Sequence, residues 1–407
     1  MDISPVLEVL DNLALMGKGA NGITRLAFSK SDMEARKYIV SLIKNIGLDY
    51  REDSFGNIFA LFGDGNAPKV AAGSHIDTVP DGGKYDGALG TVAALFAINE
   101  IKKSKIKLSH PLELIIFQAE ESSRFGHATM GSKVVTGAAD NFSEWEKAVD
   151  KDGITLPEAM RSAGFDFSEI GSCKRDKDEY KCFLELHIDQ SKNLMRDEKA
   201  VGVVSGIYAP CRVKVTIRGE TAHSGATAMR DRKDALVIAS ELVLAVRNIS
   251  IAYGEKNAVA TVSTMNVYPG AMNVIPGEAV MYIDMRGLQT KVIDEMFSII
   301  SSELSKIALR YKASGEIELL SHEKPVMLNN TARDTVEQSC RELNIDYGET
   351  VSGAGHDAMN MARITDSAMI FVRNESGISH HIAESAAKED MEKACAVLHR
   401  SLINLAK

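Results

Sequence analysis

Hydrophobic and polar residues follow two different patterns in the first part of the chain. Residues 32–46 form an amphipathic helical pattern, and a second helix is predicted over residues 90–101, directly after a glycine-rich turn. Residues 70–74 and 112–119 are continuous apolar runs, which are typical of buried strands that end in polar loops. Strands that alternate with helices predict an α/β fold with a mostly parallel sheet flanked by helices.

The middle of the chain has a different pattern. The predicted order of elements is β-α-β-β-α-β, with strands at 212–218, 258–267, 279–285 and 316–320 and helices at 232–247 and 291–311. This order is the signature of a ferredoxin-like α+β sandwich. After residues 324–325 the alternation of strands and helices resumes. We therefore predict a catalytic domain that is split in sequence, over residues 1–208 and 323–407, with a smaller domain inserted at residues 209–322.

Composition and charge exclude several classes of protein. The formal net charge of -9 argues against a general nucleic-acid-binding protein, which would show a basic face. Five cysteines without a CxxC pair favour reduced thiols over a disulfide framework or a cysteine zinc site. The first residues do not resemble a signal peptide, and the apolar runs are shorter than the roughly 20 residues of a membrane span. We expect a cytoplasmic protein that binds neither nucleic acid nor membrane.

The densest group of polar residues follows the predicted strand at 70–74. His75 and Asp77 are two residues apart, so in an extended segment their side chains point the same way, and Asp77 can hold the far ring nitrogen of His75. Asp86 lies in a glycine-rich loop before a helix, from which its carboxylate can reach inward. A simpler interpretation stays open, in which His75 is a hydrogen-bonded core histidine and Asp86 is a helix cap.

Two adjacent carboxylates, Glu120 and Glu121, follow the predicted strand at 112–119. At a strand end such side chains can diverge, one toward a metal ion and the other toward a water molecule. A metal-dependent hydrolase needs this division between a ligand and a general base. The alternative is a solvated acidic loop, but the position at a strand end, matching that of His75, favours the hydrolase.

Further histidines complete a set of metal ligands. His187 lies in a strand-like segment, His380 follows an apolar strand, and His223 lies in a loop of the inserted domain. Taken singly, each is more often structural than functional. Together the chain offers a mixed nitrogen and oxygen set, which suits Zn, Mn, Co or Ni: His75, Asp86, Glu121, His187 and His380. If Asp86 is shared, two metal ions each gain three protein ligands and can activate a water molecule between them.

At these residues the chain resembles the M20 family of metal-dependent peptidases and amidases. It is most similar to the carbamoylase branch, which comprises N-carbamoyl-L-amino acid hydrolases, allantoate amidohydrolases and β-ureidopropionases. The resemblance covers nearly the whole chain, and it rests on the motifs at residues 73–80, 85–90, 120–125, 184–190, 219–225, 272–276, 352–358 and 377–384.

The resemblance implies roles for the candidate residues. It implies two divalent metal ions per subunit, one held by His75, Asp86 and His187 and the other by Asp86, Glu121 and His380. Glu120 would be the general base, and Asp77 would orient His75. The inserted domain would serve for dimerisation and as a lid, and the protein would be a homodimer.

The resemblance also implies how the substrate is bound. His223 is similar to a residue that reaches across the dimer to stabilise the oxyanion of the tetrahedral intermediate. Asn273 and Arg286 are similar to residues that bind the substrate carboxylate, for which a bidentate arginine is well suited. Gln190 is similar to a residue that contacts the ureido group. The loop that would line the substrate site contains Gly353, Ala354, Gly355 and His356.

The chain departs from the family pattern in three places. Family members usually have Glu-Gln-Gly where this chain has Asp189-Gln190-Ser191, and the segment 224–229 after His223 also differs. After His380, a small polar residue and proline are replaced by His381 and Ile382, and the loss of the proline would loosen this loop. The metal ligands survive these changes, so we expect them to affect the choice of substrate.

These observations predict a hydrolase of linear C–N bonds. The substrate class that the resemblance favours is N-carbamoyl-L-amino acids, which would yield the amino acid, carbon dioxide and ammonia. The alternatives are an allantoate amidohydrolase, or a dipeptidase or N-acyl amino acid deacylase of the wider family. A metal-binding scaffold without activity is a further alternative, but such a scaffold has no use for Glu120.

Overall fold

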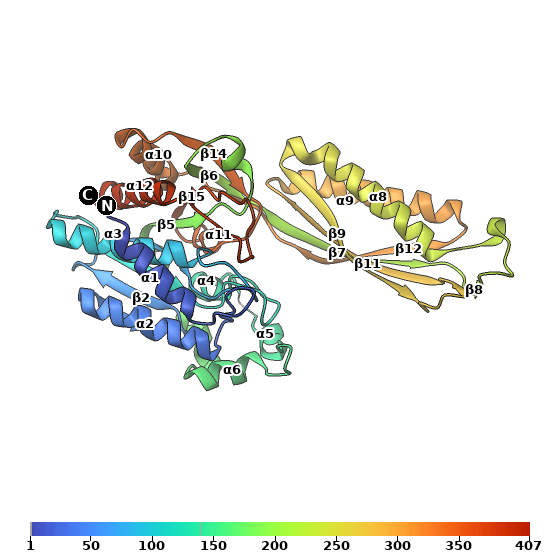
Figure 1. The fold of residues 1–407 in the computed structure, drawn as a ribbon, viewed down its shortest axis with the longest axis horizontal. Helices are drawn as coiled ribbons and strands as arrows, with labels where there is room; N and C mark the ends of the chain where they lie inside the picture. Colours follow the sequence, from blue (N-terminus) through green and yellow to red (C-terminus); the bar gives the residue numbers. More distant parts are fainter. Residues whose placement is uncertain (1, 140) are drawn as a thin grey trace. The chain divides into compact units, whose positions relative to one another are not determined.

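The computed structural model describes residues 2–139 and 141–407, which form two compact units (Figure 1). The first unit comprises Met1–Ile207 and Leu328–Lys407, and the second comprises Tyr208–Met327. The first unit is therefore built from two separate parts of the sequence.

The first unit contains a sheet with the strand order β1-β2-β4-β3-β5-β15-β6, in which β14 also pairs with β6. The strands β3, β4, β5 and β15 are mutually parallel where they pair, whereas β1, β2 and β6 add antiparallel pairs. Their bounds are β1 Asp49–Glu52, β2 Ile58–Phe62, β3 Lys69–His75, β4 Leu112–Phe117, β5 Tyr180–Ile188, β6 Val201–Ile207, β14 Tyr347–Ser352 and β15 Asp366–Val372. The mostly parallel sheet agrees with the prediction.

Helices flank this sheet, and one large apolar core joins them to it. Apolar residues of α1, α2, α3, α10 and α12 pack with those of the central strands. The bounds of the helices are α1 Ser4–Leu15, α2 Lys30–Ile46, α3 Ala88–Ser104, α4 Met130–Thr136, α5 Ser143–Lys147, α6 Leu156–Ala163, α7 Asn193–Arg196, α10 Thr331–Glu342, α11 Asp357–Met361 and α12 Lys388–Ala406. A second apolar cluster surrounds Phe55 and Trp145 and involves α4 and α6.

Local chemistry accounts for the ends of these elements. Helix α2 begins where the Ser29 side chain accepts the Asp32 N–H, and it ends at Gly47 in the left-handed conformation. The apolar run predicted as a strand over 112–119 stops earlier, at Phe117, because Ala119 turns the chain with a φ of 57°. This turn directs the next two residues, Glu120 and Glu121, away from the strand.

The second unit has the predicted order of strands and helices. Its antiparallel sheet has the order β12-β7-β11-β9, and α8 and α9 pack against it through a separate apolar core. The bounds are β7 Ala209–Arg218, α8 Ala235–Tyr253, β9 Ala258–Tyr268, β11 Glu278–Gly287, α9 Thr290–Arg310 and β12 Ser314–His322. A short pair, β8 Ala222–His223 with β10 Val274–Ile275, joins two loops. The predicted helix at 232–247 begins later because Asp234 caps it.

One helical segment among the described residues, Ala235–Lys256, is long and apolar enough to cross a membrane by length and composition alone. Core helices of soluble proteins pass the same test, so this single segment is weak evidence for a membrane span. The outer side of α8 carries exposed Val237, Leu244 and Ile251, which are spaced seven residues apart.

Candidate metal centre

Four of the candidate ligands come from the same edge of the sheet in the first unit. His75 is the last residue of β3, and His187 is the next-to-last residue of β5. Glu121 follows β4, which is parallel to β3, and His380 follows β15, which is parallel to β5. Because the carboxyl ends of parallel strands meet at one edge, residues that are far apart in the sequence converge there.

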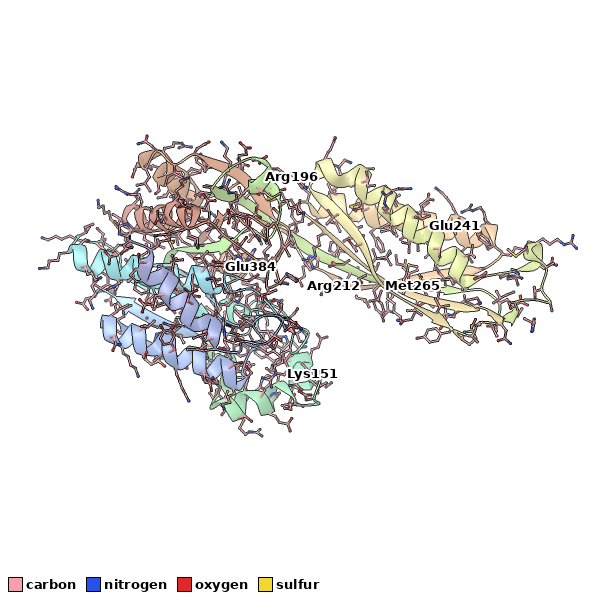
Figure 2. All side chains as sticks on the ribbon, in the orientation of Figure 1. Lys151, Arg196, Arg212, Glu241, Met265 and Glu384 are labelled. Carbon is pink, nitrogen blue, oxygen red and sulfur yellow. The ribbon has the colours of Figure 1, made fainter. Side chains whose placement is uncertain are left out.

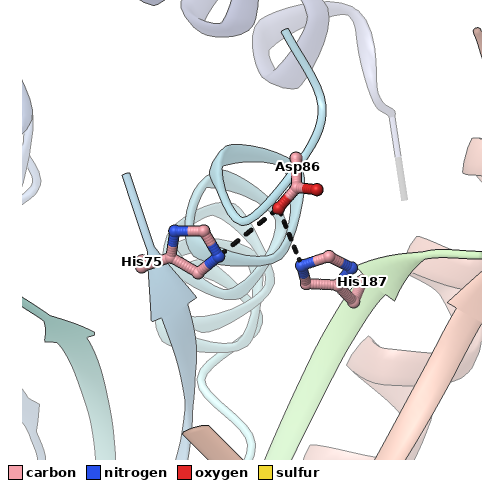
Figure 3. Close-up of side chains that lie close together, drawn as sticks. All are labelled: His75, Asp86 and His187. Carbon is pink, nitrogen blue, oxygen red and sulfur yellow. Dashed lines mark ion pairs between the residues drawn. The ribbon is translucent and has the colours of Figure 1, made fainter. Parts of the chain in front are cut away.

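Asp86 lies at the centre of this group, in the loop between β3 and α3. Its Oδ1 atom is 3.5 Å from Nε2 of His75 and 3.3 Å from Nε2 of His187 (Figure 3). The next residue, Gly87, has a φ of 62°, and a Cβ atom there would lie 2.4 Å from the His75 ring. Only glycine therefore lets this loop bring Asp86 so close to the histidine.

The other oxygen of Asp86 faces a second group. Oδ2 is 3.5 Å from Nε2 of His380, and this nitrogen is 3.3 Å from Oε1 of Glu121. We name the two groups the buried triad, which is His75, Asp86 and His187, and the outer triad, which is Asp86, Glu121 and His380. Within each triad the potential ligand atoms all lie within 4.8 Å of one another. One carboxylate whose two oxygens face different triads is suited to bridge two metal ions.

The histidines of the buried triad present the correct atoms to a metal ion. Nδ1 of His187 donates to the carbonyl of Ile188 at 2.9 Å, and Nδ1 of His75 donates to the carbonyl of Asp77 at 3.1 Å. A carbonyl oxygen only accepts, so each Nδ1 carries a proton and each Nε2 keeps the lone pair that a metal ion would need. In this structure Nε2 of His187 also accepts the Gly87 N–H at 3.2 Å. The imidazole and carboxylate donors of both triads suit Zn, Mn, Co or Ni.

The carboxylate of Asp77 has a wider role than the predicted orientation of His75. Its Oδ1 atom lies 3.6 Å from Nδ1 of His75, farther than the backbone carbonyl of the same residue. The two oxygens accept the backbone N–H groups of Glu120, at 3.2 Å, and Glu121, at 3.0 Å. Asp77 thus ties the end of β3 to the turn that carries both glutamates.

The site concentrates negative charge in a buried place. Burial and the neighbouring Asp86 raise the pKa of Glu121 to about 8, and burial raises the pKa of Glu120 well above its ordinary value. Burial also disfavours the charged form of Asp86, but the adjacent His187 and His75 outweigh it and hold its pKa well below the usual range. Divalent cations would relieve the repulsion between these carboxyl groups. The charge of the site and the types of its donor atoms therefore both fit Zn, Mn, Co or Ni.

A cavity of about 320 Å³ adjoins the outer triad. Gln190 lines it, and its Nε2 donates to Oδ2 of Asp86 at 2.8 Å, while its Oε1 is buried without a hydrogen-bond partner among the described residues. The other lining residues are Asp189, Ser191, Val351, Ser352, Gly353, Ala354, Phe371, Ser379 and His380.

Only part of the predicted substrate loop lines this cavity. Gly353 and Ala354 do, whereas Gly355 is exposed and lies outside the lining. His356 is buried beneath the site, where its Nε2 is 2.8 Å from the Ser352 hydroxyl and its ring centre is 4.5 Å from that of His187. In this structure the His356 ring packs against the ring of His187, a candidate metal ligand.

His223 and Asn273 lie side by side in the second unit. His223 pairs with Val274 in β8 and β10, and the N–H of Ser224 donates to the Asn273 carbonyl at 3.0 Å. Nδ1 of His223 accepts the N–H groups of Gly225 and Ala226, at 3.1 and 3.2 Å. The imidazole proton is therefore on Nε2, and this exposed side chain can donate a hydrogen bond to an oxyanion.

Arg286 lies at the other end of the same unit. Arg286 is near the last residue of β11 and pairs with Pro210 of β7. His223 and Asn273 lie next to the opposite end of β11, which begins at Glu278. Eight residues of extended strand separate these ends by about 27 Å. Asp284 holds the guanidinium, with its Oδ2 atom 3.1 Å from Nε and 3.0 Å from Nη2. A single copy does not bring Asn273 and Arg286 to one small carboxylate.

Sequence reasoning missed several residues that support the site. Glu185, buried on β5, accepts the Ser74 hydroxyl at 2.7 Å and the Ala358 N–H at 2.8 Å. Its position two residues before His187 places both on one face of the strand, which was the available signal. The hydroxyl of Ser379 donates to Oδ2 of Asp86 at 3.0 Å, and Glu384 contacts the same loop. No local pattern distinguishes these two.

Comparisons with known proteins identify the family of this chain. Residues 71–404 match the family described as Peptidase family M20/M25/M40. A relative from Oryza sativa named ureidoglycolate hydrolase is 34% identical over 388 residues, covering 94% of this chain and 80% of the relative. The N-carbamoyl-L-amino acid amidohydrolase of Geobacillus stearothermophilus is 33% identical over 390 residues, covering 95% and 94%. The crystal structure of a hydantoinase/carbamoylase family amidase from Burkholderia multivorans superimposes with a TM-score of 0.91 at 30% identity, covering 100% and 98%.

Proposed function

Because this chain belongs to Peptidase family M20/M25/M40, we propose that it hydrolyses the ureido C–N bond of N-carbamoyl-L-amino acids. The chain is an amidohydrolase of the type that acts on non-peptide amides, as the names of its relatives state for those proteins. The observation that carries the proposal is the position of Asp86 between the two triads. Glu120 lies beside the buried triad but belongs to neither triad. The products would be the amino acid, carbon dioxide and ammonia.

The two triads would hold the two divalent ions. Enzymes of this family use divalent metals, and the donors here suit Zn, Mn, Co or Ni. When bound, the ions would act as Lewis acids that polarise the ureido carbonyl and acidify water. His75 and His187 would orient one ion, and Glu121 and His380 would orient the other.

Glu120 would act as the general base. Its Oε2 atom lies 3.7 Å from Nε2 of His75, so its carboxylate faces the same space as the buried triad. It would take a proton from the attacking water and return it to the leaving nitrogen. Burial raises the pKa of Glu120, so its carboxyl group can keep the proton after the water attacks and until the leaving nitrogen accepts it.

The substrate would lie in the cavity beside the outer triad. Gln190, whose amide oxygen has no hydrogen-bond partner within the described part of the chain, would accept a hydrogen bond from the ureido NH₂ group. Arg286 and Asn273 would bind the carboxylate, and Nε2–H of His223 would stabilise the oxyanion. Because about 27 Å of strand β11 separates Arg286 from the end of the unit where His223 and Asn273 lie, these groups would have to come from two subunits.

A homodimer would satisfy this requirement. The stripe of Val237, Leu244 and Ile251 on α8 supports it, because exposed apolar residues at this spacing form one face that another copy can cover. Complementation tests the shared site. H223A and E120Q homodimers should each be inactive, and exchange of their subunits should restore one intact site per mixed dimer. Absence of any recovered activity, or an active monomer in sedimentation, would contradict the proposal.

Ammonia release tests the substrate class. Purified protein loaded with Mn or Zn would be offered N-carbamoyl-L-amino acids, ureidoglycolate, allantoate, dipeptides and N-acyl amino acids side by side. Turnover of the carbamoyl amino acids would support the proposal. Ureidoglycolate is the second candidate, because relatives of that name are 34% and 35% identical to this chain and the molecule also carries a ureido group next to a carboxylate. Turnover of dipeptides alone would refute both.

A further inference from the structure

Glu384 is a buried carboxylate next to the site, and it is neither a candidate ligand nor the candidate base. It follows His380 by four residues, and only 5% of it is exposed. Figure 2 labels its position in the first unit. Its Oε1 atom accepts the backbone N–H groups of Tyr85 and Asp86, both at 3.0 Å. One oxygen of Glu384 therefore fixes the backbone of the residue that both triads share.

The other oxygen contacts the loop that carries His380. The hydroxyl of Ser379 lies 3.2 Å from Oε2 of Glu384 and 3.0 Å from Oδ2 of Asp86, so it is shared between the two carboxylates. Glu384 and Ser379 thus link the loop of His380 to the loop of Asp86. The two backbone contacts of Glu384 join residues 298 and 299 positions apart in the sequence.

The loop before Asp86 is shaped to receive this carboxylate. A Cβ atom at Gly83 would lie 2.6 Å from Oε1 of Glu384 and 2.7 Å from its Cβ and Cδ atoms. Such approaches are far below normal contact distances, so a side chain at position 83 would displace Glu384. Gly83 has no left-handed backbone requirement, which means that a substitution there would act by contact with Glu384 and not by strain in the chain.

The outer triad needs such a restraint more than the buried triad does. His75 and His187 belong to strands and are buried. The His380 side chain is 46% exposed, and its backbone has a φ of 57°, a conformation that non-glycine residues rarely adopt. The hydrogen bonds that Ser379 makes to Asp86 and Glu384 therefore help to keep this histidine near Asp86.

We propose that Glu384 is a positioning residue that aligns Asp86 and His380 and thereby sets the affinity of the outer triad for its metal ion. The inference rests on the proposed metal centre. Removal of partners that orient metal ligands typically weakens metal binding by about 10- to 100-fold. The buried triad shares Asp86, but its two histidines belong to strands and keep both Nδ1 hydrogen bonds without Glu384, so its affinity should fall less than that of the outer triad.

Metal titration of the whole protein tests this inference. Apoprotein of the wild type, E384A, E384Q, G83A and the control E375A would be titrated with Zn or Mn by calorimetry. Glu375 is an exposed glutamate of the same loop. In E384A and G83A the weaker of two binding events should lose about 10- to 100-fold in affinity, while the tighter event should lose less. E384Q keeps an oxygen for the two N–H groups and should lie between E384A and the wild type, and E375A should match the wild type.

Activity measured against metal concentration gives a readout that a purely structural role would not change. E384A should regain turnover at high metal concentration, because its defect is occupancy of the outer triad. Unchanged affinity of the weaker event in both E384A and G83A would overturn the inference. If E384A does not fold, G83A and E384Q decide the question by the same criterion. A wild-type protein that binds fewer than two ions would instead refute the proposed metal centre itself.

Discussion

The two triads that share Asp86 are held in place by different parts of the fold. The buried triad takes its histidines from the ends of two parallel strands, where the sheet itself fixes the backbone. The outer triad takes His380 from a loop and Glu121 from a turn. A ligand on a strand inherits its position from the sheet, whereas a ligand on a loop needs hydrogen bonds from its neighbours.

The loop of His380 shows what replaces the sheet. Asn374 is buried, accepts the N–H groups of Ser376 and Gly377, and donates to the carbonyl of Ile378. We expected the absence of a proline after His380 to loosen this loop. In the structure Nδ1 of His381 accepts the Ala383 N–H at 3.0 Å, so hydrogen bonds hold the segment where a proline ring would otherwise stiffen it.

The largest effect should come from a residue that belongs to neither triad. In E120Q, turnover should fall by about 10²- to 10⁴-fold, because the amide cannot take a proton from water. Both metal ions should stay bound, since no ligand is changed. Steady-state ammonia release and metal analysis of the same preparation measure the two properties. Loss of metal together with activity would place Glu120 among the ligands.

Removal of one histidine from each triad tests the comparison directly. H380A should retain one tightly bound ion per chain, because the buried triad is intact. H187A should lose the tight ion, since it removes a buried ligand and leaves Oδ1 of Asp86 with only one of its two adjacent histidines. Metal content after dialysis against metal-free buffer measures the difference. Equal losses in both variants would show that the triads are not independent sites.

Metal removal should reveal the same difference in the unmodified protein. A chelator should remove the ions in two kinetic phases, because the outer triad is partly exposed and lies beside an open cavity. The fast phase should carry about half of the metal and abolish turnover. Rapid mixing with a coloured chelator would follow both phases. A single phase that releases all the metal would contradict the comparison.

The smallest effect should come from the hydroxyl that joins the two carboxylates. S379A removes one hydrogen bond to Asp86 or Glu384, which corresponds to roughly 2- to 10-fold in the affinity of the outer triad. The backbone bonds of Glu384 to Tyr85 and Asp86 remain, so the loss should be less than in E384A. The calorimetric titration described for Glu384 measures it. A loss equal to that of E384A would assign the restraint to Ser379.

Much of this architecture could be predicted from the sequence because it depends on local patterns. The apolar runs at 70–74 and 112–119 are strands β3 and β4, and the pattern of the middle segment matches the order of elements in the second unit. Element ends were less accurate where one side chain decides them, as with Asp234 at the start of α8. The side chains named as metal ligands all lie at one edge of the sheet, while their roles remain predictions.

The sequence by itself determined which types of element form and which residues carry metal-binding atoms, because periodicity and residue type are properties of short segments. Only the tertiary structure decided that the two oxygens of Asp86 face different histidines, that Arg286 lies far from Asn273 within one copy, and that Glu384 reaches the backbone of Asp86. These facts depend on the register of paired strands and on contacts between segments hundreds of residues apart, which no local pattern of the sequence specifies.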